Sequence, residues 1–254
     1  MSLRVLGLLV LAAGAFVLAL SLGHWQTRRA AQKLEIEAQW EAANRAAPLE
    51  LSARSLPPIE SLPMRVKLAG TFEHGKSVWL ENRQHEARPG FWVLTPLRHA
   101  DGTVVLVNRG WVPRDPADRA RRPPVAEPAG PVTVEGLALP HAPRLLDLGE
   151  ARDGGPLPAL WQNLDYARYE SVSGLSVARL VVQQTGSTRS AADAPLADEG
   201  LVRAWARPAS GVEKHRGYAF QWYALAALIA LLTVFFSWRH LRRRVLRSSP
   251  GSSS

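Results

Sequence analysis

Two histidines lie beside long uncharged segments, and they are the first residues of this sequence that suggest chemistry. His24 follows the uncharged run 5–22, and His215 precedes a second uncharged run, 218–238. Neutral imidazole is a good ligand for iron and the common axial ligand of haem. Ionisable residues at a membrane surface also warrant a functional hypothesis. The alternative is that each histidine simply lies among lipid headgroups, and the residues alone leave both interpretations open.

Other catalytic and metal-binding patterns are weak. The sequence has no cysteine, and its 7 histidines include no H-x-x-x-H pair. His74 and His85 flank an expected strand and could converge on a metal, but surface positions explain them equally well. The segment 174–178, GLSVA, resembles a nucleophile elbow, yet an elbow needs a strand before the serine and a helix after it. Here the expected order is the reverse, so we expect a protein that is not an enzyme.

The two uncharged runs have the length of membrane spans. The run 218–238 has 21 residues and would extend about 31 Å as a helix, which matches a hydrocarbon core of ~30 Å. Aromatic residues lie near both of its ends, as at membrane interfaces. The alternative for the first run is a cleaved signal peptide, but bulky and charged residues follow it where small ones are required. We therefore expect two retained spans, and hence contact with a lipid bilayer.

The positive charge is concentrated beside the spans. The chain has a net charge of +9, but Arg4 and the arginines after Trp238 contribute six of these charges, and the segment 26–216 carries 25 Lys/Arg against 22 Asp/Glu. This distribution argues against nucleic-acid binding. The arginine-rich C-terminal end predicts that both termini are cytoplasmic and that the central domain lies outside. For a bacterial protein, that places the domain in the periplasm and the spans in the inner membrane.

The segment between the spans changes from helical to strand-like character. Residues 26–47 contain neither Gly nor Pro and continue the helical pattern of the first span. Segments rich in β-branched and aromatic residues then predict strands at 66–73, 77–84, 90–98, 103–112, 131–139 and 177–185, with a tight hairpin at 99–102 and a short helix at 164–172.

The predicted fold class is therefore a membrane protein whose two transmembrane helices flank a mainly antiparallel β, α+β, extracytoplasmic domain. The predicted segments are a first transmembrane helix at 5–25, a helical extension at 26–47, the β-rich domain at 48–211, a second transmembrane helix at 217–238 and a basic cytoplasmic tail at 239–254.

The sequence Asn108-Arg109-Gly110-Trp111 ends a strongly apolar expected strand. One interpretation is structural, with Arg109 paired to a carboxylate and Trp111 packed on the sheet. The other is a contact with a partner. The residues favour the structural interpretation without deciding between the two.

Several longer motifs resemble one known family. These are GHWQTRRAAQK after the first span, GTFEHGKSVWLENR, GFWVLTPLRHADGTVVLVNRGWVPRD, VTVEGL, and KHRGYAFQWYALA at the start of the second span. Nearly end to end, the chain resembles the surfeit locus protein 1 family of cytochrome c oxidase assembly factors, of bacterial type.

The resemblance implies a protein that receives or holds haem a on its way to subunit I of the oxidase, with the haem a synthesis machinery as a second partner. It also implies that His215 is the axial ligand of the haem iron. Trp222 and Tyr218 would then lie beside the macrocycle, and Arg216, with Lys214 and Arg28 or Arg29, would pair with the propionates. The alternative function is a membrane scaffold or sensor with an exported β-rich domain and no haem.

Overall fold

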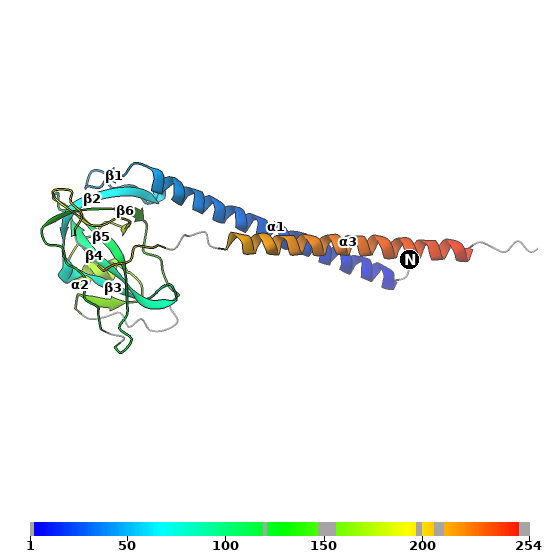
Figure 1. The fold of residues 1–254 in the computed structure, drawn as a ribbon. Helices are drawn as coiled ribbons and strands as arrows, with labels where there is room; N and C mark the ends of the chain where they lie inside the picture. The colour runs from blue at the N-terminus through cyan, green and yellow to red at the C-terminus, as the bar shows by residue number, and fades with distance from the viewer. Residues whose placement is uncertain (1–2, 119–120, 147–155, 197–199, 206–210, 249–254) are drawn as a thin grey trace, which may run out of the picture. The chain divides into compact units, whose positions relative to one another are not determined.

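The computed structural model describes residues 3–118, 121–146, 156–196, 200–205 and 211–248 (Figure 1). The chain divides into a helical unit, residues 1–38 with 207–254, and a central unit, residues 39–206. The elements in chain order are α1 (Leu3–Arg45), β1 (Leu49–Glu50), η1 (Ile59–Ser61), β2 (Met64–Phe72), η2 (His74–Lys76), β3 (Val78–His85), β4 (Arg88–Arg98), β5 (Val104–Pro113), β6 (Pro131–Leu139), β7 (Ala159–Trp161), α2 (Tyr166–Ser173), β8 (Val181–Gln184), β9 (Arg189–Ser190) and α3 (Val212–Ser248).

The predicted fold class is confirmed, because two helices long and apolar enough to cross a membrane flank a sheet-rich domain in the chain. Helix α1 has 43 residues and would extend about 65 Å, roughly twice the hydrocarbon thickness. The predicted extension of the first span past the membrane is therefore helical. It ends at Arg45, just before Pro48, whose ring disfavours helical backbone in the residue before it.

Helix α3 is longer at both ends than the predicted second span. It begins at Val212 instead of 217, so His215 lies inside the helix. It also continues to Ser248 through much of the segment predicted as a tail, because residues 239–248 contain no Gly or Pro. Residues 249–254 of that predicted tail lie outside the described residues.

The sheet of the central unit closes on itself. Strands are ordered β1-β2-β6-β8-β5-β4-β3-β7, and β2 pairs again with β4 through Thr71–Arg98 and Phe72–Leu97. This pairing makes a ring of β2, β6, β8, β5 and β4. Every strand of the ring contributes side chains to one buried cluster, which includes Leu68, Leu97, Val105, Val134 and Val182. The ring is therefore a small barrel with an apolar interior.

A second layer covers the outer face of the barrel strands. Helix α2, with strands β3 and β7, packs Tyr169, Leu80 and Trp161 against Leu94 and Leu106 of the barrel. Asp165 caps α2 by accepting from the backbone of Arg168 at 2.9 Å. Strands β4 and β5 are buried on both faces, which explains why their sequences are apolar almost throughout rather than alternating.

The predicted strands were found with shifts of a few residues at their ends, and the predicted hairpin at 99–102 and short helix are present. Most strand pairs are antiparallel, as predicted. The pairs β1–β2, β3–β7 and β5–β8 are parallel, however, and the short strands β1, β7 and β9 were not predicted.

Candidate functional site

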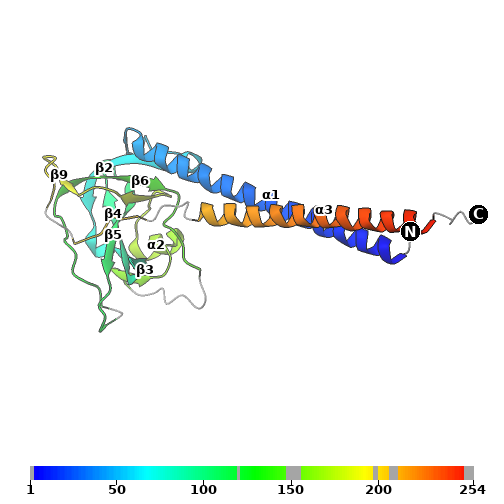
Figure 2. The ribbon, with the colours of Figure 1, turned by 45° about the vertical axis from the view of Figure 1, so that its right-hand side comes forward.

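A hydrogen bond joins His215 of α3 to Gln26 of α1 within the helical unit. Nδ1 of the imidazole lies 2.7 Å from Oε1 of the Gln26 side chain, and both side chains are half-buried. The helices lie side by side in both views (Figures 1 and 2). Because a carbonyl oxygen can only accept, Nδ1 carries the proton and donates it. Nε2 has no hydrogen-bond partner within the described part of the chain.

Small residues allow this pair of helices to approach closely. Ala19, Gly23 and Ala30 are the buried residues of α1. A Cβ added at Gly23 would lie 2.8 Å from Cε1 of Tyr223, so a larger side chain there would displace the tyrosine. The Tyr223 hydroxyl also lies 3.4 Å from the hydroxyl of Thr27. The register that brings Gln26 to His215 thus depends on tight packing between small side chains.

One face of α3 is less exposed than the rest of the helix. Ala219 and Ala226 are buried, and His215 and Trp222 are half-buried, at the spacing of a single helix face. The small side chains at 219 and 226 allow close packing of a neighbouring helix, and α1 contacts α3 in this unit. Any ligand of His215 is therefore restricted to the side of the ring that bears Nε2.

The other residues predicted for this site are more exposed. Tyr218 is 53% exposed. Arg216 is exposed and donates to Glu213 at 3.0 Å. His24 is exposed, and the hydrogen-bond partner of His215 is Gln26 instead. Sequence reasoning missed Gln26 because an amide carries no charge, although it lies on the same helix face as Ala19, Gly23 and Ala30.

A hollow of ≈ 290 Å³ lies on α1 just beyond Gln26. It is lined by Trp25, Arg28, Arg29 and Gln32. Arg29 donates to the amide oxygen of Gln32 at 3.3 Å. The arrangement places two guanidinium groups and an indole on one stretch of helix, a combination that suits a ligand with carboxylates and an aromatic body. These are the cations that the sequence predicted as propionate partners.

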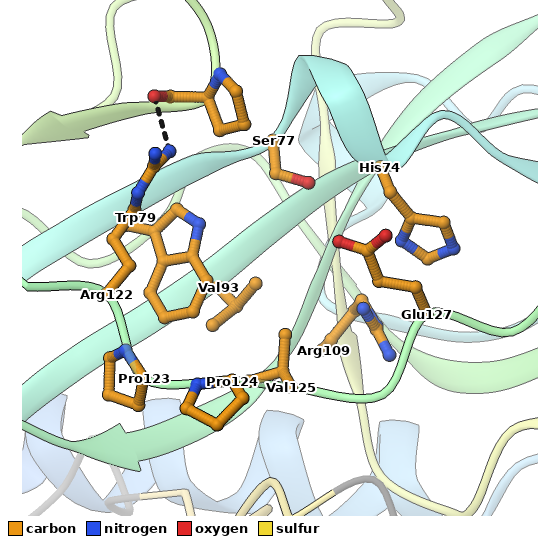
Figure 3. A pocket seen from close by; sticks show the side chains of 11 residues that line it. His74, Ser77, Trp79, Val93, Arg109, Arg122, Pro123, Pro124, Val125 and Glu127 are labelled. Carbon is orange, nitrogen blue, oxygen red and sulfur yellow. Dashed lines mark hydrogen bonds between the residues drawn. The ribbon is translucent and has the colours of Figure 1, made fainter.

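The central unit has a separate pocket of ≈ 250 Å³ (Figure 3). Trp79 and Val93 form an apolar wall, and the segment 122–127 forms the opposite side. Arg122 donates to the carbonyl of Pro158 at 2.6 Å, and Arg109 donates to the carbonyl of Ala126 at 2.6 Å. This volume lies just below the ~300–1,000 Å³ of pockets for drug-sized ligands.

The segment Asn108-Arg109-Gly110-Trp111 is built into the domain interior. Trp111 is 3% exposed, and its indole donates to the carbonyl of Arg83 at 2.9 Å. Gly110 has a φ of +148°, and a Cβ there would lie 2.8 Å from Cβ of Leu201. These contacts agree with the structural interpretation of Gly110 and Trp111. Arg109 is 1% exposed and stacks over Phe72 at 5.1 Å.

The residues considered for metal binding and hydrolysis have ordinary structural roles. His74 donates to the carbonyl of Pro128 at 3.0 Å, whereas the His85 ring packs 5.2 Å from that of Trp111. Within the described residues, three or more His, Asp or Glu side chains nowhere gather into a metal-binding group. Gly174 ends α2 with a φ of 66°, so the segment 174–178 is a turn after a helix and not an elbow.

Comparison with known proteins identifies the family. The profile of the SURF1 family matches residues 13–227, most of the chain. The chain belongs to the SURF1 family. It is 27% identical to a SURF1-like protein of Monosiga brevicollis over 92% of this chain and 89% of that protein. It is 29% identical to surfeit locus protein 1 of Xenopus tropicalis, over 85% and 71% of the two chains. A SURF1-like protein of Rickettsia conorii is 25% identical over 89% of each chain.

Membership in the SURF1 family confirms the resemblance that the sequence motifs indicated. The match with the SURF1 profile runs from α1 into α3 and therefore includes both Gln26 and His215. The SURF1-like proteins of Rickettsia show that bacterial members exist, in agreement with the bacterial type expected from the sequence.

Proposed function

We propose that this SURF1-family protein binds haem a through His215 and assists its insertion into subunit I of cytochrome c oxidase. The observation that carries the proposal is the state of the His215 ring. Its Nδ1 is occupied by Gln26 at 2.7 Å, while Nε2 has no partner among the described residues. In its neutral form, a half-buried imidazole with one unengaged nitrogen has the chemistry that haem iron requires of a ligand.

The surrounding residues suit the remainder of such a ligand. Arg28, Arg29 and Lys214 are exposed cations on the helices that carry Gln26 and His215, and charge-assisted hydrogen bonds from them would hold propionates. Arg216 would exchange its ion pair with Glu213 for a similar contact. Trp222 and Tyr218 offer aromatic surface on α3. Bound haem a would supply the redox iron that the oxidase needs, and this chain would hold it without performing catalysis.

The proposal includes a location and partners. The arginine-rich end of α3 supports an arrangement in which both termini are cytoplasmic and the central domain is periplasmic in a bacterial inner membrane. Subunit I would receive the haem, and the haem a synthesis machinery would supply it. The candidate ligand His215 belongs to the helical unit, so the central domain is available for contacts with these proteins.

Absorption spectroscopy of two histidine variants tests the proposal. The wild type, His215→Ala and His24→Ala are purified in detergent after co-expression with haem a synthesis enzymes, and the Soret absorbance is normalised to protein. We expect His215→Ala to insert in the membrane normally but to lose most of its haem, whereas His24→Ala retains it. Full haem content in His215→Ala would refute this site. No Soret band in repeated wild-type preparations would favour a scaffold without haem.

A further inference from the structure

The hydrogen bond between Gln26 and His215 connects residues that are 189 positions apart in the sequence. It is a side-chain contact between two separate helices, and its 2.7 Å length is short for an N–H···O hydrogen bond. Most side-chain hydrogen bonds in proteins reach the backbone or water instead. A short contact between two half-buried side chains therefore restricts the rotation of both.

The identity of the acceptor decides the chemical state of the ring. A neutral imidazole has one N–H, and the carbonyl oxygen of Gln26 requires that proton to be on Nδ1. The lone pair that can bind a metal is then on Nε2, which has no partner in the described chain. The same hydrogen bond fixes the plane of the ring. In metal sites, a partner on the second ring nitrogen commonly sets the tautomer and the orientation of a ligating histidine.

The helix packing holds Gln26 in this position. Gln26 lies three residues after Gly23 and four before Ala30, so the three share the face of α1 whose small members are buried. Tyr223 packs over Gly23, one helical turn before Gln26, and its hydroxyl lies 3.4 Å from that of Thr27, the residue after Gln26. The amide is therefore held before any ligand arrives.

We infer that Gln26 is a positioning residue that presets His215 in the Nδ1–H tautomer with Nε2 directed to the ligand. This inference rests on the proposed function, because it assigns Gln26 a role in the binding of haem a by His215. Gln26 would not touch the iron. It would act through the imidazole, by reducing the freedom that the ring loses on binding and by increasing its electron donation.

The consequences differ among substitutions at this position. Leucine at 26 removes the acceptor with little change in size, so we expect a mixture of ring tautomers and about 10- to 100-fold weaker haem binding. Glutamate keeps an acceptor and adds negative charge, so we expect retained haem with a lower reduction potential than the wild type. Gln221→Leu is the matched control, because Gln221 is an exposed amide on α3 and lies outside the residues proposed to hold haem.

The first experiment uses the full chain without haem. Protein labelled with ¹⁵N-histidine is placed in lipid nanodiscs, and the ring nitrogens of His215 are assigned by comparison with His215→Ala. We expect a protonated Nδ1 in the wild type and in Gln221→Leu, and a mixed tautomer in Gln26→Leu. A protonated Nε2 in the wild type, or an unchanged tautomer in Gln26→Leu, would overturn the inference.

The second experiment uses the haem-loaded protein. Haem content and reduction potential are measured for the wild type and the three Gln variants, with circular dichroism as the control for helix formation. Loss of haem from Gln26→Leu but not from Gln221→Leu supports the positioning role, as does a lowered potential in Gln26→Glu. If Gln26→Leu fails to fold, an unchanged potential in Gln26→Glu still refutes the role.

The two proposals fail in distinguishable ways. Full haem content in His215→Ala removes the proposed haem site and the role of Gln26 with it. Haem lost from His215→Ala but bound normally by both Gln26 variants, with unchanged potential, overturns only the role of Gln26.

Discussion

Replacing Trp111 by alanine should severely destabilise the central domain. The indole is 3% exposed, and its ring fills the space over Gly90, where an added Cβ would lie 2.4 Å from Cε2 of Trp111. The ring also packs against His85 at 5.2 Å and donates to the carbonyl of Arg83 at 2.9 Å. Truncation therefore removes apolar contacts and leaves a buried carbonyl without its donor.

The expected magnitude follows from these contacts. Removing a large buried aromatic side chain costs ~3–5 kcal/mol, and a domain of this size loses ~2–4 °C in Tm for each kcal/mol. We therefore expect Tm to fall by about 6–20 °C. The lost ~3–5 kcal/mol is a large share of the ~5–15 kcal/mol total stability of a typical domain. Trp111→Phe keeps most of the ring but leaves the Arg83 carbonyl unpaired, so it should cost less than alanine yet more than ~1 kcal/mol.

Thermal unfolding of the full chain in detergent measures the relative stabilities of the wild type and the two Trp111 variants. The wild type should be most stable, Trp111→Phe intermediate and Trp111→Ala least stable, and the amount of Trp111→Ala protein in membranes should fall accordingly. If Trp111→Ala accumulates and melts like the wild type but assembles no oxidase, the structural reasoning is wrong. The indole would then act through a partner.

Three further predictions concern other parts of the chain. Gly23→Leu should cost ~1–3 kcal/mol by displacing Tyr223, whereas Gly14→Leu should be neutral, since nothing lies within 4 Å of a Cβ there; melting curves of both compare them. Hydrogen bonds from the backbone N–H groups of Ala53 and Thr103 hold the pKa of Asp101 well below its usual value, so its stabilising contribution is present at neutral pH and is lost as pH falls below about 4. Asp101→Asn should therefore lower Tm at pH 7 and have less effect at pH 3, and an equal effect at both would contradict this explanation. Alkaline phosphatase fused at position 123 should be active and a fluorescent protein at the C-terminus should fluoresce, and the reverse pattern would invert the proposed topology.

Local patterns predicted the elements of the fold well. The spans follow from length and apolar composition, and the strands from β-branched and aromatic runs, because these signals lie within a few neighbouring residues. The closure of the barrel does not appear in such patterns. Pairing of Phe72 with Leu97, or of Leu106 with Val181, depends on contacts distant in sequence. Strands buried on both faces also lack the alternation that would have indicated their register.

The candidate site was predicted only in part, because local patterns reveal His215 but not its partner on the other helix. His215 drew attention because it lies beside a long uncharged run, and Trp222, seven residues further on, lies on the same face of a helix. Gln26 could be found only once the two helices were placed in register. A histidine at 24 was the more conspicuous candidate, but a helix rotates about 100° per residue, so two positions separate an exposed side chain from one that faces α3.

The positions of Gln26 and His215 in the chain determine when their hydrogen bond can form during synthesis. The two partners come from the first and last helices of the chain, 189 residues apart. At ~5–20 residues per second, about 10–40 s pass between the synthesis of one and that of the other. Throughout this interval α1 exists without the imidazole, and a chain that stops before α3 has neither the histidine nor its partner helix. The nascent protein consequently gains its candidate ligand only when the central domain has been completely synthesised and the second span has joined the first.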